Sequence, residues 1–187
     1  MTSISTARLR LRPVTQADAP ALTALFAEWE VIRWLSGPPW PYTEQDMRDF
    51  IGGVLSGATP DPEINFVIEH GAEAVGAMSW RQRKASHLQA GSGPNIGFWL
   101  GRVHLGRGFM TEAVTGLVDH LFASTDADVI YCGAFFENER SLHIQRKLGF
   151  TIDGQTTLRS RARAIDLPHT NTLLPRETWQ DRLKAQP

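Results

Sequence analysis

The sequence has one cysteine, Cys132, among its 187 residues, so no disulfide can form within the chain. It has no run of about 18 apolar residues, the length of a membrane-spanning helix, and it does not start with the basic-then-apolar pattern of a signal peptide. It also has no excess of positive charge: the net charge is -1, which argues against a protein that coats a nucleic-acid backbone. We therefore expect a cytoplasmic protein without membrane or nucleic-acid partners.

The composition is that of a folded protein, because hydrophobic residues make up 42% and charged residues 21% of the chain. A chain of this length buries about 70% of the surface that its unfolded form exposes, so its core needs no disulfide or structural metal. No repeat, low-complexity block or long linker interrupts the sequence. We expect residues 1–187 to form one domain.

Hydrophobic periodicity predicts alternating strands and helices of an α/β protein. The clearest helix has apolar residues at helical spacing: Met110, Ala113, Val114, Leu117, Val118, Leu121 and Phe122. Capping signals predict that two earlier helices begin at Thr15 and Thr43. The other expected elements are strands at 8–12, 64–68, 74–80, 95–100 and 129–135, a loop at 81–94, a helix at 138–148 closed by Gly149, and two strands with a terminal turn or helix at 151–179.

Two glycines, Gly106 and Gly108, stand directly before this helix. Such a turn lets successive backbone amides point at one spot, and the helix N-terminus adds partial positive charge, so the place suits a phosphate. Arg102 and Arg107 could add charge-assisted hydrogen bonds. The alternative is a plain tight turn.

Other phosphate, metal and nucleophile motifs are absent. Thr111 stands where a dinucleotide fingerprint needs its third glycine, and there is no Gly-Lys-Ser/Thr of a P-loop. There is no His-Glu-x-x-His, and the six histidines lack close metal spacing, so we expect no metal. Ser92 does not lie in a nucleophile elbow.

A second polar group, Asn138 and Ser141, opens the helix expected at 138–148. For each residue a structural interpretation stays open: Asn138 as a helix N-cap, and Ser141 as a polar residue of the first turn.

Together these segments resemble the GNAT N-acetyltransferase superfamily, and within it the branch that acetylates ribosomal-protein N-termini. The resemblance covers nearly the whole chain. It is carried by the segments 6–13 (TARLRLRP), 95–100 (NIGFWL), 106–113 (GRGFMTEA) and 147–150 (KLGF), and by Asn138-x-x-Ser141. It implies an α/β (α+β) fold: a mixed, mostly antiparallel twisted sheet with a splayed parallel strand pair, flanked by helices.

The resemblance also implies an acetyl-CoA site between two splayed strands, at about 95–100 and 129–135, and no metal. Backbone groups of Phe98, Trp99 and Leu100 would pair with the pantetheine arm. Asn138 would bind the pantetheine or the thioester end, and Ser141 would protonate the leaving thiolate. The pyrophosphate would be held by the turn made of His104, Leu105, Gly106, Arg107, Gly108, Phe109 and Met110.

The chain departs from the family pattern at three places. Val103 stands where the family loop usually opens with Gln or Arg, and Arg102, one residue earlier, is the candidate to compensate for it. Asn95 replaces a general-base carboxylate found in many members, and Gln145 replaces a Tyr acid found in others. The sequence therefore does not assign the general base. The only suggestions are Glu137 and His87, each acting through water.

The resemblance also implies that the proline-rich segment at 38–42 forms a wall of the acceptor site. We expect Trp34, Trp40 and Tyr42 to bind the acceptor, with an apolar flap over the core as the alternative. Arg159, Arg161 and Arg163 alternate, which predicts one strand face. That face is either solvated or suited to an acidic acceptor or partner.

The sequence thus predicts an acetyl-CoA-dependent N-acetyltransferase whose acceptor is a primary amine, first of all a peptide N-terminal α-amine. An α-amine has a pKa near 7.7–8.0 and needs less help to lose its proton than lysine, whose pKa is about 10.4. The alternatives are an acetyltransferase of polyamines or antibiotics, and an acyl-CoA-binding module without catalysis. We expect a monomer or a homodimer.

Overall fold

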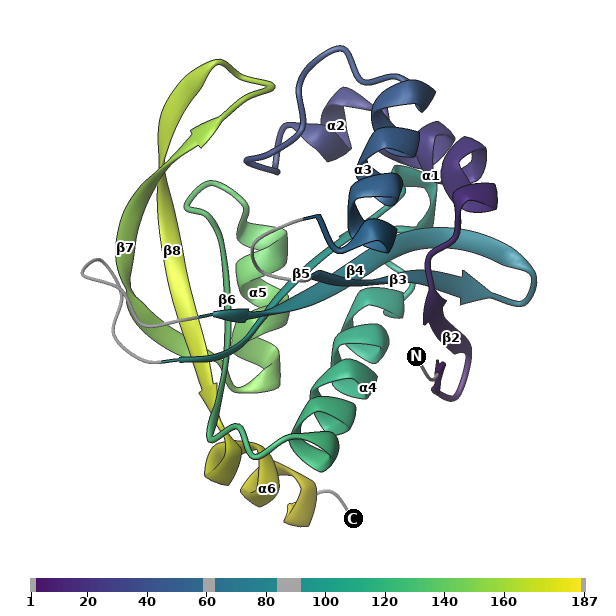
Figure 1. Cartoon of the computed structure of the whole chain (residues 1–187). Helices are drawn as coiled ribbons and strands as arrows, with labels where there is room; N and C mark the ends of the chain where they lie inside the picture. The colour runs from purple at the N-terminus through teal and green to yellow at the C-terminus, as the bar shows by residue number, and fades with distance from the viewer. Residues whose placement is uncertain (1–2, 59–62, 84–91, 186–187) are drawn as a thin grey trace.

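The computed structural model describes residues 3–58, 63–83 and 92–185. Eight strands form one sheet in the order β1-β2-β3-β4-β5-β6-β8-β7 (Figure 1). The strands are β1 (Ile4–Ser5), β2 (Leu9–Pro13), β3 (Glu63–His70), β4 (Glu73–Arg83), β5 (Gly93–Leu100), β6 (Val129–Phe135), β7 (Thr151–Ser160) and β8 (Ile165–Pro175). The helices are α1 (Ala19–Phe26), α2 (Trp29–Ile32), α3 (Glu44–Ser56), α4 (Phe109–Ser124), α5 (Glu139–Leu148) and α6 (Arg176–Lys184), with 3₁₀ turns at Gln16–Asp18 and Arg102–His104.

Neighbouring strands of the sheet are antiparallel except β5 and β6, which are parallel. This confirms the predicted mixed, mostly antiparallel sheet with one parallel pair. Parallel neighbours need a crossover, and here α4 makes it, starting after β5 and ending before β6.

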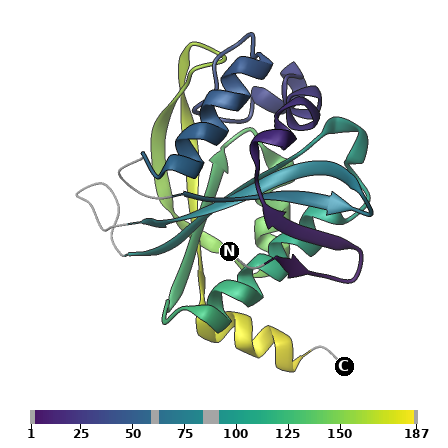
Figure 2. The same ribbon diagram turned by 45° about the vertical axis from the view of Figure 1, so that its right-hand side comes forward.

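Two clusters of buried side chains cover the two faces of the sheet. On one face α4 packs against β2 to β6, and all seven apolar positions predicted for it are buried. On the other face α1, α2 and α3 pack against residues such as Val67, Ala77 and Trp99 (Figures 1 and 2). The sheet therefore separates a side covered by α4 from a side covered by α1 to α3.

Local sequence signals set several helix ends. Thr15 and Thr43 each form the predicted capping box, with Asp18 and Asp46 respectively. Gly149 closes α5 with a φ of 95°, a conformation that glycine adopts at little cost. The loop expected at 81–94 is shorter in the structure, since β4 runs to Arg83 and β5 begins at Gly93, and the four-residue helix α2 was not predicted.

Arg12 on β2 joins the first helical segment to the sheet. Its guanidinium donates to both oxygens of Asp18, at 2.8 and 2.6 Å, and to Glu69 of β3 at 2.6 Å. Burial raises the pKa of Asp18, but the hydrogen bonds from Arg12 and Thr15 outweigh burial and hold it below its ordinary value. Asp18 is therefore ionised at neutral pH and stabilises the fold as a carboxylate.

Among the described residues, no helix combines the length and the apolar character needed to cross a membrane.

Candidate functional site

Strands β5 and β6 separate soon after they meet. Their pairing is limited to Asn95 opposite Tyr131, whereas β4 stays paired with β5 as far as Leu100. From Ile96 onward, the edge of β5 that faces β6 therefore has no partner strand in the part of the chain that the structure describes. Backbone N–H and C=O groups on such an edge need hydrogen-bond partners, and the amides of a pantetheine arm can provide them.

A cavity of about 600 Å³ opens where the two strands diverge. Its wall includes all three residues expected on the β5 side, Phe98, Trp99 and Leu100, and residues 132–135 of β6 on the other side. Leu105 and Met110, at the two ends of the glycine turn, also line it. The cavity thus runs from this turn through the gap between the strands.

The turn between Leu105 and Met110 leaves backbone amides open. Gly106 and Gly108 both have positive φ angles, 77° and 76°, and α4 begins immediately after Gly108. Among the described residues, no group accepts a hydrogen bond from the amides of residues 106–110. These donors at the N-terminus of a sixteen-residue helix fit a pyrophosphate.

Two of the expected donors have other partners. The amide of His104 donates to Gly101 O at 3.0 Å, and that of Leu105 donates to Arg102 O at 3.3 Å. The His104 ring is buried and lies outside the walls of the cavity. We therefore restrict the predicted phosphate contacts to residues 106–110.

The turn is held from outside by the connection between β1 and β2. Glu112 of α4 accepts hydrogen bonds from Thr6 Oγ1 at 2.6 Å and from the amide and Nε of Arg8, both at 2.7 Å. Arg8 Nη1 also donates to Arg107 O at 3.1 Å. Burial raises the pKa of Glu112, but these hydrogen bonds outweigh burial and lower it overall. Sequence reasoning gave neither Arg8 nor Glu112 this role, because 104 residues separate them.

Asn138 and Ser141 both line the cavity from the start of α5. Asn138 Oδ1 accepts a hydrogen bond from the Ser141 amide at 3.3 Å, so the capping interpretation is confirmed. Ser141 Oγ accepts from Gln145 Nε2 at 3.0 Å, and Gln145 Oε1 accepts from Thr172 Oγ1 at 2.6 Å. Gln145 thus fixes the Ser141 oxygen as an acceptor and leaves the hydroxyl proton for a group in the cavity.

A second cavity, of about 590 Å³, lies between the sheet and helices α1 and α3. It shares Asn95, Gly97, Phe98 and Trp99 with the first cavity, so the two meet at β5. The two cavities are therefore neighbours on either side of these β5 residues.

The three aromatic residues expected on the acceptor side lie in different places. Tyr42 lines the second cavity, and Trp34 lines the first. Trp40 lines neither cavity; it is 43% exposed and packs edge-on against Trp29. Burial, together with the nearby charges of Asp46 and Asp49, raises the pKa of Tyr42 to about 12, so its hydroxyl keeps its proton.

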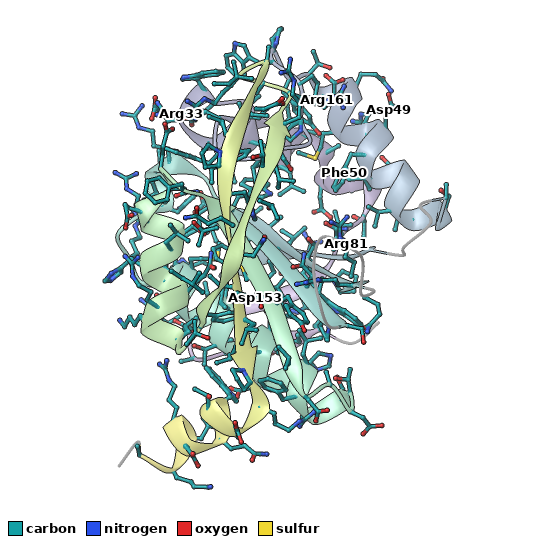
Figure 3. The ribbon with its side chains drawn as sticks, turned by 90° about the vertical axis from the view of Figure 1, so that its left-hand side faces the viewer. Arg33, Asp49, Phe50, Arg81, Asp153 and Arg161 are labelled. Carbon is teal, nitrogen blue, oxygen red and sulfur yellow. The ribbon has the colours of Figure 1, made fainter. Side chains whose placement is uncertain are left out.

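Charges of both signs line the second cavity. Asp46 and Asp49 come from α3, Arg81 from β4, and Arg161 from the turn between β7 and β8. Figure 3 labels three of these residues, Asp49 on α3, Arg81 on β4 and Arg161 after β7. Hydrogen bonds from Thr43, helped by the charge of Arg161, lower the pKa of Asp46, which is therefore ionised.

The predicted arginine face of a strand is wrong. Strand β7 ends at Ser160, and residues 161–164 form a turn, so the alternation stops after Arg159. Arg159 pairs with Asp166, Arg161 donates to Gly37 O, and Arg163 pairs with Glu137. The three side chains have separate partners and do not lie on one strand face.

The two family positions for a titrating group hold amides, Asn95 and Gln145, and the two suggested bases stay untested. Glu137 pairs with Arg163 at 2.8 Å, and His87 lies outside the described residues. The structure places another titratable residue, His169 of β8, in the wall of the first cavity. Sequence reasoning missed it, although its spacing from Asn171 puts both on one face of an expected strand.

Among the described residues, no cluster of His, Cys, Asp or Glu is placed to hold a metal ion.

Comparisons with known proteins agree with this geometry. A family model described as an Acetyltransferase (GNAT) domain matches residues 8–151. An uncharacterized N-acetyltransferase, p20 of Bacillus licheniformis, is 28% identical over 95% of this chain and 98% of its own length. The spermidine N(1)-acetyltransferase of Escherichia coli K12 is 26% identical over 79% of this chain and 75% of its own.

Solved structures show the same fold. RimL, a ribosomal L7/L12 alpha-N-protein acetyltransferase in complex with coenzyme A, superposes with a TM-score of 0.77 at 18% identity, over 93% of this chain and 98% of that one. An identity this low shows the fold and no more. The family match covers well over half of the chain, with the glycine turn and the diverging strands inside it. The chain therefore belongs to the GNAT family, as an acetyltransferase that uses acetyl-CoA as its co-substrate.

Proposed function

We propose that this enzyme transfers the acetyl group of acetyl-CoA to the α-amine at the N-terminus of a peptide or protein. The observation that carries the proposal is the junction of the two cavities at β5. Acetyl-CoA would extend from the glycine turn to Ser141 in the first cavity, and the peptide would enter through the second. The amine would then attack the thioester directly.

The absence of a strong base at the family positions supports an α-amine. Asn95 lines both cavities but does not titrate, and Gln145 is fixed between Ser141 and Thr172. At pH 7 a lysine amine is neutral in only about one molecule in 10³, whereas an α-amine is neutral in about one in ten. An enzyme without a strong base therefore favours the α-amine, and its kcat/KM should rise from pH 7 to 8 and then level.

Ser141 would protonate the leaving thiolate, and Asn138 would hold the thioester end of the co-substrate. The hydrogen bond from Gln145 supports the acid role, because it leaves the Ser141 proton as the one free to move into the cavity. Asn138 keeps this helix turn in place through its bond to the Ser141 amide.

One observation favours a polyamine as the alternative acceptor. Asp46 and Asp49 both line the second cavity, and two carboxylates suit the distal ammonium groups of a polyamine. The spermidine acetyltransferase among the relatives agrees with this alternative. Arg81 and Arg161 in the same wall oppose it, since a peptide has carbonyl and carboxylate groups for them and a polyamine has none.

Thiol release from acetyl-CoA tests the choice. The acceptors are a short peptide with a free N-terminus, the same peptide with a blocked N-terminus and one lysine, and spermidine. We expect the highest kcat/KM with the free N-terminus. Faster reaction of the blocked peptide would contradict the α-amine. Faster reaction of spermidine, lost selectively in Asp49→Asn, would establish the polyamine instead.

A further inference from the structure

His169 on β8 is a titratable residue in the wall of the first cavity. It stands opposite Phe135 in the pairing of β8 with β6, and it lines the same cavity as Ser141. Residues directly opposite each other in an antiparallel pair point to the same face. Successive residues of a strand point to opposite faces of the sheet. Cys132 belongs to the core cluster formed with α4, so positions 133 and 135 point to the face away from α4. His169 therefore faces the side on which α1 to α3 and the second cavity lie.

The space for the imidazole ring comes from Gly133 on β6. A Cβ at this position would stand 2.4 Å from His169 Cε1 and 3.2 Å from Nε2. The Cε1–Nε2 edge of the ring thus lies directly against the strand that forms one wall of the cavity. Phe135 packs edge-on against the ring, with centroids 5.9 Å apart.

Asn171 sets the tautomer of His169. Its Nδ2 donates to Thr156 Oγ1 at 3.4 Å, which turns its Oδ1 toward His169 Nδ1 at 3.0 Å. An amide oxygen only accepts hydrogen bonds, so Nδ1 has the proton and Nε2 has a free lone pair. Among the described residues, no group donates to Nε2.

The surroundings keep the ring neutral. Gly133, Phe135 and Asn171, which contact it, have no charge. Burial lowers the pKa of His169 below its ordinary value of 6.5, and the Asn171 hydrogen bond offsets only part of this. The other titratable side chains in the cavity wall are Glu30, Arg81, Arg83, Arg140 and Cys132, and burial keeps the Cys132 thiol protonated by raising its pKa to about 12.

We propose that His169 Nε2 is the base that accepts the proton of the acceptor amine, with Asn171 as the residue that positions it. The proposal rests on acetyl transfer to an amine and not on which amine is used. The amine nitrogen forms a bond to the thioester carbonyl carbon, and Nε2 takes one proton from that nitrogen. The C–S bond then breaks, the sulfur leaves with the electron pair, and it takes a proton from Ser141. The imidazolium proton returns through water to Ser141, so an amine and acetyl-CoA become an amide and CoA–SH.

Base and acid are thus on opposite sides of the reacting carbon. His169 faces the acceptor side of the sheet, and Ser141 belongs to α5 next to α4. The divergence of β5 and β6 opens the sheet between them. A base whose pKa lies below 6.5 also suits an α-amine better than a lysine, because the proton transfer is less uphill by about two and a half pKa units.

The test compares wild-type enzyme with His169→Gln, Asn171→Asp and the control His143→Gln, which changes an exposed histidine of α5. The measurements are kcat as a function of pH with the best acceptor, and CoA affinity by calorimetry. We expect His169→Gln to lower kcat about 100-fold, to leave CoA affinity within threefold and to remove the acid limb of the profile. Asn171→Asp should move that limb to higher pH, since a carboxylate favours the imidazolium.

A His169→Gln enzyme that keeps kcat within twofold, or keeps the acid limb, would overturn the proposal. If His169→Gln does not fold, an Asn171→Asp profile identical to that of wild type would overturn it equally. A wild-type enzyme that acetylates lysine or spermidine faster than an α-amine would reject the proposed acceptor while the variants still test His169.

Discussion

Replacing Gly108 with alanine separates the role of the glycine turn in binding from its role in folding. Gly108 has a φ of 76°, a left-handed conformation that costs a residue with a side chain about 1–2 kcal/mol. Its new methyl group would lie 3.4 Å from Arg8 Nη2, and the substitution strains the turn that presents the amides of residues 106–110. We expect Gly108→Ala to lower the free energy of unfolding by that amount and to weaken acetyl-CoA binding at least tenfold, which is about 1.4 kcal/mol.

Gly57 provides the matched control. It closes α3 with a φ of 64°, and a Cβ there would meet nothing within 4 Å. Gly57→Ala therefore has the same backbone strain at a place far along the chain from the turn. We expect it to lose about 1–2 kcal/mol of stability and no affinity for acetyl-CoA.

The assay is calorimetric titration with acetyl-CoA, together with chemical unfolding of both variants. The reasoning predicts equal losses of stability and unequal losses of affinity. If the two variants bind acetyl-CoA with the same affinity while their stabilities fall alike, the amides of the turn do not hold the pyrophosphate.

Three further predictions follow from single contacts. Ser141→Ala should lower kcat and leave acetyl-CoA affinity within a few-fold; if only affinity falls, Ser141 is a binding contact and not an acid. Asp18→Asn should lower the free energy of unfolding at pH 7 by at least about 1.5 kcal/mol, because it removes the charged partner of Arg12. The pKa of Asp18 is lower in the folded state than in the unfolded state, where it is about 3.9. The Asp18 carboxylate therefore stabilises the fold fully above the unfolded pKa, and this stabilisation is lost as the pH falls through the folded pKa. The stability of Asp18→Asn should accordingly depend less on pH than that of wild type below about pH 5. Cys132 should resist iodoacetamide at pH 8 in the folded enzyme, since burial raises its pKa to about 12, and rapid labelling seen by mass spectrometry would show that the site opens.

Elements with strong local signals could be predicted from the sequence. The periodic apolar residues of α4, the buried strand at 129–135, and the capping residues Thr15 and Thr43 all lie where they were expected. These signals concern neighbours in the chain, so they need no knowledge of the fold. The prediction of an arginine face was wrong because it also used only neighbours in the chain. Arginine alternates with other residues from 159 to 163 in the sequence, but the strand ends at Ser160. Beyond it Arg161 bonds to Ser36 and Gly37, which are distant in the sequence.

The candidate site likewise has parts that the sequence predicts and parts that only the structure brings together. The glycine turn, Asn138 and Ser141 could be identified because motifs of the family are short and continuous in sequence. The relay from Ser141 through Gln145 to Thr172 joins α5 to β8, and the clamp on the turn joins Arg8 to Glu112. No local pattern indicates such pairs, because each partner alone is an ordinary polar residue.

The sequence by itself determined the fold family, the helix that follows the glycine turn and the backbone freedom at Gly106 and Gly108, since all three depend on side-chain periodicity and on residues without a Cβ. Only the tertiary structure decided which side chains meet across the opened sheet. His169 faces the acceptor side because β8 pairs with β6 in one register, and a shift of one residue would turn it to the other face. Its ring reaches the cavity because Gly133 on the neighbouring strand leaves the room, and Asn171 then fixes which nitrogen has the free lone pair.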